Sequence, residues 1–501
     1  MNILFVIIHL IVEAREISVI NIERRGFLFG AAATAVAAMP TRPALAAGTA
    51  PGSAMGLKVK PMEKVRVGLV GMGKRGCPAA ERLLQIPGVE VRALAEVTEW
   101  RFGQLKEFIK KAGHAYALEE YRGADGFRRL VESPNVDVVY ICGPWQLHGA
   151  MAIAGMRAGK QTMVECPGVF TVDDCWELVE LAEKNGCNCM PLENCCYGEI
   201  EMLMMSLVRE GLFGELVHAE GAYIHDLRQS QLASGWPEMW NHWRSRWNQL
   251  HKGNQYPAHG LGPISRALGI NRGDQYKYMV SLESDAFNVR AYAAAKNRAW
   301  NRPDLGPDDW RRQLHMAMGD MNTTLIKTEK GRSILLQHDV VTPRPYTRGN
   351  VLTGTKGIMM DYPFRVGFEE EPGKGLHSFW PPTADKVRKE HMHPLWQKAG
   401  KIAEKVGGHG GMDFLMDLRW AYCLQNGLPL DMDVYDLAAW SSVCELSERS
   451  VRAGSMPMQA VDFTRGAWKT AAPCAVEDLD LSKIRLPGEK DVKKSANALN
   501  V

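Results

Sequence analysis

One short run near residue 70 restricts the fold of this chain more than any other feature of its sequence. The segment Val65 to Val70 is mostly apolar and predicts a buried strand, and a helix is predicted from Ala79 to Gln85. Between them stands Gly71-Met72-Gly73-Lys74-Arg75-Gly76, which has the spacing G-x-G-x-x-G. A strand, a glycine turn and a helix in this order predict the start of a doubly wound α/β fold that binds a dinucleotide.

Each glycine of the run has a physical task in such a site. Gly71 permits the tight turn, Gly73 lets the backbone approach a pyrophosphate, and Gly76 lets helix and strand pack closely. The pyrophosphate then lies at the helix N-terminus. The next predicted strand, Val89 to Ala95, ends at Glu96, whose carboxylate can bind ribose hydroxyls and would repel a 2′-phosphate. We therefore expect NAD rather than NADP.

The alternation of helices and strands continues after this unit. It predicts helices near 102–112, 126–133, 148–158 and 172–185, and strands at 136–142 and 161–165. Strands that alternate with helices predict an N-terminal Rossmann domain, a doubly wound parallel sheet, over residues 63–190. Ligands of such sheets bind beyond the carboxyl ends of the strands, which indicates the segments Gly143 to His148 and Glu165 to Pro167.

The second half of the chain has a different pattern. After Asn194 it predicts a helix at 205–210, a long strand at 216–223, and a hairpin of 321–328 with 333–341 that turns at Lys330-Gly331. We expect a C-terminal substrate-binding α/β domain with a large open, mainly antiparallel sheet over residues 191–480, and a tail at 481–501. Its functional groups should be polar side chains at strand ends and in loops.

The first 62 residues have the composition of a targeting signal followed by a linker. Arg24-Arg25 precedes Phe27-Leu28, a run of small residues and the cleavage pattern Ala44-Leu45-Ala46, which predicts a twin-arginine signal peptide at 1–46 and a linker at 47–62. An ordinary secretory signal or a chance arginine pair is the alternative. We expect export to the periplasm or beyond. Since no later segment has 18 consecutive apolar residues, we expect no membrane insertion after signal removal.

Charge and cysteine content exclude several classes of function. The 60 Lys and Arg residues nearly balance the 57 Asp and Glu residues, so the chain has no large excess of positive charge that would attract nucleic acid. The 11 Cys are odd in number and clustered, and a twin-arginine precursor folds before export, so we expect small buried thiols rather than disulfides. The Cys187-x-Cys189 and Cys195-Cys196 pairs lack a second spaced pair, and we expect no metal.

Several residues of the second half are candidates for chemistry. In Tyr256-Pro257-Ala258-His259-Gly260 the Tyr and His offer proton-transfer groups on a backbone constrained by Pro and Gly. His225 begins a His-Asp-x-Arg motif at a strand end, with a structural salt bridge as the alternative reading. Trp236, Trp240, Trp243 and Trp247 either stack on a sugar or pack as one face of a helix. The glycines around His409 either approach a ligand or form a tight loop.

Two levels of resemblance can be read from these motifs. Pro144-x-x-x-His148 followed by Glu165-x-Pro167 resembles the glucose–fructose oxidoreductase/inositol dehydrogenase family, although that family's Glu-Lys-Pro is Glu-Cys-Pro here. The chain from about Val65 to Trp468 is similar to glycoside hydrolase family 109, whose characterised activity is NAD-dependent α-N-acetylgalactosaminidase. The motifs that carry this second resemblance are Leu192 to Tyr197, Gly211 to Leu216, Tyr223 to Arg228, Tyr256 to Gly260, Ile270 to Gly273, Arg344 to Tyr346 and Gly408 to Asp413.

The resemblance implies a set of site residues. Beside the glycines, it places NAD against Lys74, Arg75, Glu96, Trp145, Gln146, Leu147, His148, Glu165, Cys166 and Asn194. It places the sugar against Tyr223, Arg244, Tyr256, Pro257, Ala258, His259 and Tyr346. We expect the catalytic residues among His259, Tyr346, Tyr256 and His225, with His259 and Tyr346 as the leading candidates for the acid/base pair. We expect Arg244 to bind the N-acetyl group.

This chain departs from the family's pattern in four places. Trp-Gln-Leu-His replaces Trp-Glu-Trp-His, Glu-Cys-Pro replaces Glu-Val-Pro, and Tyr-Pro-Ala-His replaces Tyr-Pro-Thr-His. The stretch between Arg228 and Arg244 is also shortened, which bears on the sugar or aglycone that fits.

The resemblance further implies a route of glycoside cleavage. Terminal α-N-acetylgalactosamine would be removed from glycans, with retention, by oxidation at C-3, loss of the C-2 proton, elimination, addition of water and reduction. No net redox change occurs, so a tightly bound NAD serves many cycles. The alternative is an NAD-dependent sugar or cyclitol dehydrogenase of the wider family. A homo-oligomer is possible in either case.

Overall fold

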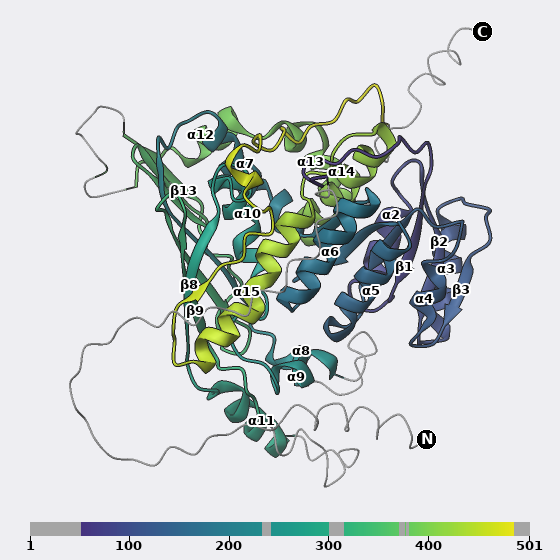
Figure 1. Cartoon of the computed structure of the whole chain (residues 1–501), viewed down its shortest axis with the longest axis horizontal. Helices are drawn as coiled ribbons and strands as arrows, with labels where there is room; N and C mark the ends of the chain where they lie inside the picture. Colours follow the sequence, from purple (N-terminus) through teal and green to yellow (C-terminus); the bar gives the residue numbers. More distant parts are fainter. Residues whose placement is uncertain (1–51, 233–241, 300–314, 370–375, 377–379, 485–501) are drawn as a thin grey trace. The chain divides into compact units, whose positions relative to one another are not determined.

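The computed structural model describes residues 52–232, 242–299, 315–369, 376 and 380–484 (Figure 1). The expected signal peptide, most of the expected tail, and Trp236 and Trp240 lie outside these residues. Within them, no helix combines the length and the apolar character needed to cross a membrane.

The first half forms a parallel sheet of six strands in the order β3-β2-β1-β4-β5-β6, which confirms the doubly wound fold. The strand order reverses between β1 and β4, the position at which such sheets bind ligands. The strands are β1 (Val65–Val70), β2 (Val89–Glu96), β3 (Glu119–Arg122), β4 (Val138–Ile141), β5 (Gln161–Glu165) and β6 (Cys189–Leu192).

Helices cover both faces of this sheet because its strands are apolar on both sides. One apolar cluster joins Val67 and Leu69 of β1 to Leu83 and Leu105, and a second joins Val70 to helices on the other face. The helices are α2 (Gly76–Leu83), α3 (Trp100–Lys111), α4 (Gly126–Leu130), α5 (Trp145–Arg157) and α6 (Val172–Asn185).

The second half contains a sheet of eight strands in the order β13-β12-β11-β7-β10-β9-β8-β14. All described pairs are antiparallel except β7 with β10, which confirms the mainly antiparallel sheet. The predicted hairpin is confirmed, with Gly331 at φ +85° in its turn. The strands are β7 (Leu216–Ile224), β8 (Tyr276–Glu283), β9 (Asn322–Thr328), β10 (Ser333–Asp339), β11 (Val351–Gly354), β12 (Gly357–Met360), β13 (Arg365–Phe368) and β14 (Met458–Gln459).

The helices of this half lie before, between and after those strands. The predicted helix at 205–210 belongs to a longer helix, α7. The elements are η1 (Asn194–Tyr197), α7 (Glu199–Arg209), α8 (Arg228–Leu232), α9 (Trp243–Asn248), α10 (Ala258–Leu268), α11 (Asn288–Ala299), α12 (Ala384–His391), α13 (Pro394–Val406), η4 (His409–Gly411), α14 (Met412–Asn426), α15 (Val434–Arg452) and η5 (Ala467–Lys469).

Three contacts between helices and sheets position the later site. Helix α10 lies directly on β7, since a Cβ atom at Gly221 would be 2.2 Å from the carbonyl oxygen of Gly260. Helix α14 returns to the first sheet, where Asp417 accepts hydrogen bonds from Tyr140 and Arg82, both at 3.0 Å. Helix α15 packs on both α6 and β8 (Figure 1). The two halves therefore share one packed interior.

Candidate functional site

A cavity of about 400 Å³ lies at the carboxyl ends of the first-sheet strands, where residues of both halves meet. It is the point that the strand order predicts for ligand binding. Most of the sequence-predicted site residues line this cavity: Gly73, Lys74, Arg75, Trp145, His148, Glu165, Cys166, Asn194, Tyr223, His225, Arg244, Tyr256, His259 and Tyr346.

A larger cavity of about 1000 Å³ lies elsewhere, between the segment around Met55 and residues 471–482. Its main charged groups are already paired, Arg419 with Asp431 at 2.6 Å and Arg272 with Asp433 at 2.7 Å. We therefore place the functional site at the smaller cavity.

The glycine run forms a cradle beside the first cavity. Gly71 has φ +85°, and a Cβ atom at Gly76 would lie 2.0 Å from the carbonyl oxygen of Gly71, so only glycine fits at position 76. A pocket of about 110 Å³ adjoins this turn and includes Glu96 and Leu147 in its lining. Gly73 lines both the pocket and the larger cavity. The two together offer one continuous path for a dinucleotide.

Glu96 ends β2 directly below the glycine turn. Its carboxylate accepts hydrogen bonds from the backbone N–H of Met72 and of Val97, both at 2.7 Å, and from that of Thr98 at 2.9 Å. These bonds hold an anionic group at the strand end where a dinucleotide places its ribose. The residues present thus fit the adenosine side of NAD.

Arg75 is fixed by carboxylates from both halves. Its Nε and Nη2 donate to Glu165 at 3.0 and 2.8 Å, and its Nη1 donates to Asp413 at 3.2 Å. Asn194 donates to the other oxygen of Asp413. Burial alone would raise the pKa of Asp413, but Arg75, the hydrogen bond with His409 and Arg82 hold that pKa well below its usual value.

Asp413 was missed by the sequence analysis, although the motif Gly408 to Asp413 contains it. The structure shows why glycines precede it. A Cβ atom at Gly408 would lie 2.6 Å from the Cβ of Asp413, and Gly411 has φ +104°. The glycines therefore form a tight loop that delivers a buried carboxylate to Arg75.

The first turn of α5 contributes side chains to one side of the cavity, where aromatic rings pack together. The ring of Trp145 packs against Trp243 at 5.1 Å between centroids and against Tyr256 at 5.6 Å. The side-chain amide of Gln146 donates to the carbonyl oxygen of Trp243 at 2.9 Å. Both ring nitrogens of His148 lie 2.9 Å from backbone carbonyl oxygens, and burial lowers its pKa.

The two tryptophans of α9 differ in their surroundings. Trp247 stacks on His251 at 3.8 Å and donates from Nε1 to Gln255, so packing explains it. Trp243 packs on Trp145 and also lines the cavity.

Five rings of the second half gather on the other side of the cavity. Tyr223 lies 4.5 Å from Tyr256 between ring centroids, and His259 meets both rings edge-on at 5.0 and 4.7 Å. Tyr346 faces His225 at 5.1 Å. Burial raises the pKa of each of the three tyrosines. Their hydroxyls therefore keep their protons at neutral pH and can donate hydrogen bonds.

Arg244 lies among these rings and has unused hydrogen-bonding capacity. Its guanidinium is 4.6 Å from the ring centroid of Trp145 and 5.2 Å from that of Tyr256. The Nε and Nη2 groups are buried and have no hydrogen-bond partner in the described structure. Since buried donors are normally paired, these two groups indicate a polar ligand.

The remaining predicted residues play supporting parts. Ala258 begins α10 and Pro257 directly precedes it. Neither residue lines the cavity, but the two fix Tyr256 and His259 on either side of them. Burial and the charge of Arg244 lower the pKa of His225. The neighbouring Asp226 forms an ion pair with Arg228 at 2.6 Å, as the salt-bridge reading of this motif predicted.

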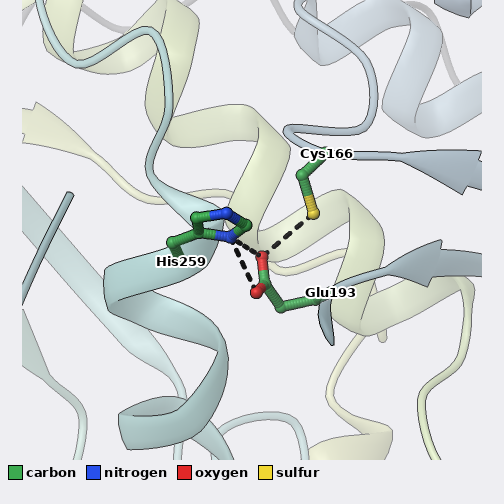
Figure 2. Close-up of side chains that lie close together, drawn as sticks. All are labelled: Cys166, Glu193 and His259. Atoms are coloured by element: carbon green, nitrogen blue, oxygen red, sulfur yellow. Dashed lines mark hydrogen bonds and ion pairs between the residues drawn. The ribbon is translucent and has the colours of Figure 1, made fainter. Parts of the chain in front are cut away.

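Figure 2 shows a buried carboxylate between a histidine and a thiol. Nδ1 of His259 lies 2.8 and 2.9 Å from the two carboxylate oxygens of Glu193, and Sγ of Cys166 lies 2.9 Å from one of them. The Glu193 side chain is fully buried. Burial would raise its pKa, but His259 and the hydrogen bonds from Cys166 and from the N–H of Cys195 lower that pKa overall.

This arrangement orients the imidazole of His259. An ionised Glu193 accepts the Nδ1 proton of the neutral ring, which leaves Nε2 as the basic nitrogen. Glu193 was also missed by the sequence analysis. The available signal was its place at the end of β6, because side chains at the carboxyl ends of parallel strands meet at one edge.

The thiol of Cys166 is directed to Glu193, while the residue also lines the cavity. Burial raises its pKa, so the neutral thiol is a hydrogen-bond donor. Cys166, Glu193 and His259 are also the one group in the described part of the chain whose donors could surround a metal ion, within 4.8 Å of one another. The expected absence of a metal stays a prediction.

All eleven cysteines lie within the described residues, and none of them forms a disulfide. Eight are buried and three are half-buried: Cys77, Cys142 and Cys474. The expectation of small buried thiols is confirmed for those eight.

Each half of the chain matches a known protein family. Residues 65–192 match the family described as "Oxidoreductase family, NAD-binding Rossmann fold", and residues 197–470 match "Glycosyl hydrolase 109, C-terminal domain". The cradle is therefore an NAD site. An "Alpha-N-acetylgalactosaminidase" of Bacteroides fragilis is 41% identical over 85% of this chain and 98% of its own length. A "Glycosyl hydrolase family 109 protein" of Shewanella pealeana is 41% identical over 88% and 93%.

Solved structures resemble the fold at much lower identity. Levoglucosan dehydrogenase in complex with NADH and levoglucosan matches 80% of this chain and all of its own, with a TM-score of 0.56 and 16% identity. Apo scyllo-inositol dehydrogenase from Lactobacillus casei matches 80% and 99%, with a TM-score of 0.53 and 14% identity. At such identity the likeness supports the fold alone.

Proposed function

Because this chain belongs to glycosyl hydrolase family 109, we propose that it is a glycosidase that removes terminal α-N-acetylgalactosamine from glycans, with NAD as a retained cofactor. The name of the Bacteroides fragilis relative supports this substrate. The observation that carries the proposal is Arg244, which lines the aromatic cavity next to the NAD cradle. Its buried Nε and Nη2 groups have no hydrogen-bond partner among the described residues. An acetyl carbonyl oxygen would complete their hydrogen bonding.

Among the described residues, Glu165 is the one carboxylate that lines this cavity, and a bound cofactor would explain why a catalytic pair is not needed. When bound, NAD would supply reversible hydride transfer at C-3 of the sugar, and a ketone at C-3 would make the C-2 proton acidic. Such enzymes are an exception to the two-carboxylate scheme. Glu165 is consistent with a mechanism that uses no catalytic carboxylate pair, because its carboxylate accepts hydrogen bonds from Arg75.

We assign the proton transfers of this route to different residues of the cavity. The Nε2 atom of His259, with Glu193 holding Nδ1, is the leading base. Tyr346 holds its proton, since burial raises its pKa, and is the leading acid for the departing glycosidic oxygen. Tyr223 and Tyr256 donate hydrogen bonds to ring hydroxyls, and His225 supplies a neutral imidazole beside Tyr346.

The elimination route makes a prediction about hydrogen at C-2. When an aryl α-N-acetylgalactosaminide is hydrolysed in deuterated water, we expect the released sugar to carry deuterium at C-2, because the abstracted proton exchanges with solvent before it is replaced. Mass spectrometry of the product measures this. Product without deuterium at C-2 would exclude the route.

The same assay separates hydrolysis from net dehydrogenation. A glycosidase of this kind releases the aglycone without net production of NADH. A sugar or cyclitol dehydrogenase would instead accumulate NADH with a free polyol and would leave the glycoside intact.

We further infer export through the twin-arginine route to the periplasm or beyond. Arg24-Arg25 and the cleavage pattern at Ala44 to Ala46 support this. The lack of disulfides among the eleven described cysteines supports it as well, since a protein folded in the cytoplasm keeps reduced thiols and can load NAD there. Residues 1–46 fused to a reporter should direct it out of the cytoplasm. Replacing both arginines by lysine should retain the reporter inside, and unchanged export would refute the inference.

A further inference from the structure

One carboxylate oxygen of Glu193 accepts two protons whose place a single divalent cation can take (Figure 2). This atom, Oε2, lies 2.9 Å from Nδ1 of His259 and 2.9 Å from Sγ of Cys166. The other oxygen, Oε1, accepts a hydrogen bond from the backbone N–H of Cys195 at 3.0 Å. If the two side-chain protons leave, one nitrogen, one sulfur and one oxygen face one another while the backbone still holds the carboxylate.

These three donors are ligands that zinc and other thiophilic cations prefer. Zn²⁺ binds cysteine sulfur, imidazole nitrogen and carboxylate oxygen at about 2.0–2.3 Å, which places the ligands of a tetrahedral site about 3.4–3.6 Å apart. The three donor atoms here lie within 4.8 Å of one another. The two hydrogen-bonded pairs need to widen by only about 0.5–0.8 Å to meet the zinc geometry, which small side-chain rotations allow. Mg²⁺ and Ca²⁺ prefer oxygen ligands and do not match this set.

A cation can reach the three donors from the cavity of the functional site. Cys166 and His259 line that cavity, whereas Glu193 lies behind them and is fully buried. The protein therefore supplies three ligands, and a water molecule from the cavity supplies the fourth. Three protein ligands with one open position are a common arrangement around zinc.

Positive side chains in the same cavity restrict which cations can bind. They are Lys74, Arg75 and Arg244. The charge of Arg75 is offset by ion pairs with Glu165 at 2.8 Å and with Asp413 at 3.2 Å. The other two oppose any cation that is attracted by charge alone. A cation that also bonds to a thiolate and an imidazole gains affinity that Mg²⁺ does not.

We propose that Cys166, Glu193 and His259 form an inhibitory binding site for Zn²⁺ and other thiophilic divalent cations. When the ion binds, the thiol of Cys166 releases its proton to solvent, and the Nδ1 proton of His259 is exchanged for one on Nε2. The three side chains carry one negative charge before binding and none afterwards, because a doubly positive ion enters and one proton leaves. The ion is an inhibitor and not a cofactor, so the expectation that catalysis uses no metal is unchanged.

Such an ion would stop the proposed reaction at its base. With the metal on Nδ1, the proton of the imidazole lies on Nε2, which can then accept no other. This consequence rests on the proposed function, in which Nε2 of His259 is the base, whereas the binding of the ion does not. The thiol stands where the pattern Glu-Val-Pro of family 109 has a valine, which offers no ligand. Sensitivity to zinc is therefore expected to depend on Cys166.

Binding is tested with Co²⁺, a spectroscopic probe for zinc sites, in the metal-free holoenzyme. We expect one equivalent of Co²⁺ to produce the near-ultraviolet absorption of a thiolate–Co²⁺ bond, and Zn²⁺ to abolish it. Cys166→Val should lack this absorption, and so should the nearly isosteric Cys166→Ser if the valine variant does not fold. Cys142→Ser, which replaces another thiol of the same cavity, should keep it. No absorption in the wild type, or the same absorption without Cys166, would overturn the site.

Inhibition is tested by hydrolysis of an aryl α-N-acetylgalactosaminide. Saturating Zn²⁺ should lower kcat/KM of the wild type by about 10²-fold or more, the contribution of a general base, and a chelator should restore it. Loss of a second-shell partner alone costs about 10- to 100-fold in metal affinity, so half-inhibition of Cys166→Val should need at least that much more Zn²⁺. The wild type and Cys142→Ser should respond alike, and Mg²⁺ should have no effect.

The two measurements separate the inference from the proposed function. Equal zinc sensitivity of Cys166→Val and the wild type would overturn the inhibitory site. A thiolate–Co²⁺ absorption without inhibition by Zn²⁺ would overturn the inhibition and remove His259 as the base. Failure of the metal-free holoenzyme to hydrolyse the glycoside would refute the proposed function, and the Co²⁺ titration would still decide whether the three side chains bind the ion.

Discussion

Replacing His259 by asparagine should lower kcat/KM by about 10²- to 10⁴-fold, the usual contribution of a positioned general base. The amide cannot take up a proton at the place of Nε2, while its size and polarity allow the side chain to remain in the site. Glu193→Gln should cost less, because the amide oxygen can still accept the Nδ1 proton but no longer stabilises a charged imidazole. Steady-state kinetics with an aryl α-N-acetylgalactosaminide measure both effects, and tightly bound NAD in each purified variant shows that the site is intact.

The thiol of Cys166 provides a matched control for this assignment. Its proton donates to Glu193, so Cys166→Val removes one hydrogen bond from the carboxylate that orients the imidazole. A hydrogen bond of about 1 kcal/mol corresponds to a change of about fivefold in rate. We therefore expect Cys166→Val to lower kcat/KM by about fivefold, and Cys166→Ser, which keeps a donor, to change it less. Full activity of His259→Asn would remove His259 from the mechanism.

Replacing Asp413 by alanine should lower the free energy of unfolding by about 3–5 kcal/mol, the usual effect of removing one member of a buried ion pair. Asp413 lies 3.2 Å from Arg75 and 3.5 Å from Arg82, and it also accepts the hydrogen bond of Asn194. Its loss leaves two arginines with fewer anionic partners and frees Arg75 and Asn194 beside the NAD cradle. We therefore expect weaker NAD retention as well, measured by nucleotide content after gel filtration.

Acid should destabilise the native protein partly through the same group. The pKa of Asp413 in the folded protein lies below 3.8, its ordinary value, so its contribution is complete above that pH and is lost as the pH falls further. Urea unfolding at several pH values should show a smaller acid-induced loss in Asp413→Ala than in the wild type. Asp125→Asn, which removes an exposed partner of Arg128 at 3.8 Å, should change stability by at most about 0.5 kcal/mol. An equally small effect of Asp413→Ala would contradict the role of Asp413 in linking the two halves of the chain.

Much of the fold could be predicted because its signals are local. The glycine run, the apolar strand before it and the alternation that follows depend on neighbouring residues, and the structure has the parallel sheet that they predict. Two of its strands carried no such signal. Strand β3, Glu119–Arg122, is a polar edge strand, and β6, Cys189–Leu192, is four residues long and contains a proline. Pairing with a neighbour, rather than composition, makes them strands.

The sequence by itself determined the nucleotide half, the preference for NAD, the motif residues of the second half and the family to which they point. Only the tertiary structure decided which groups act together. Glu193 lies 66 positions before His259, and Asp413 lies 338 positions after Arg75, yet each pair is in direct contact. The reason is physical. A sequence motif reflects the backbone conformation that a single loop or strand end requires. The pairing of side chains from distant motifs depends instead on how α10 lies on β7 and how α14 returns to the first sheet.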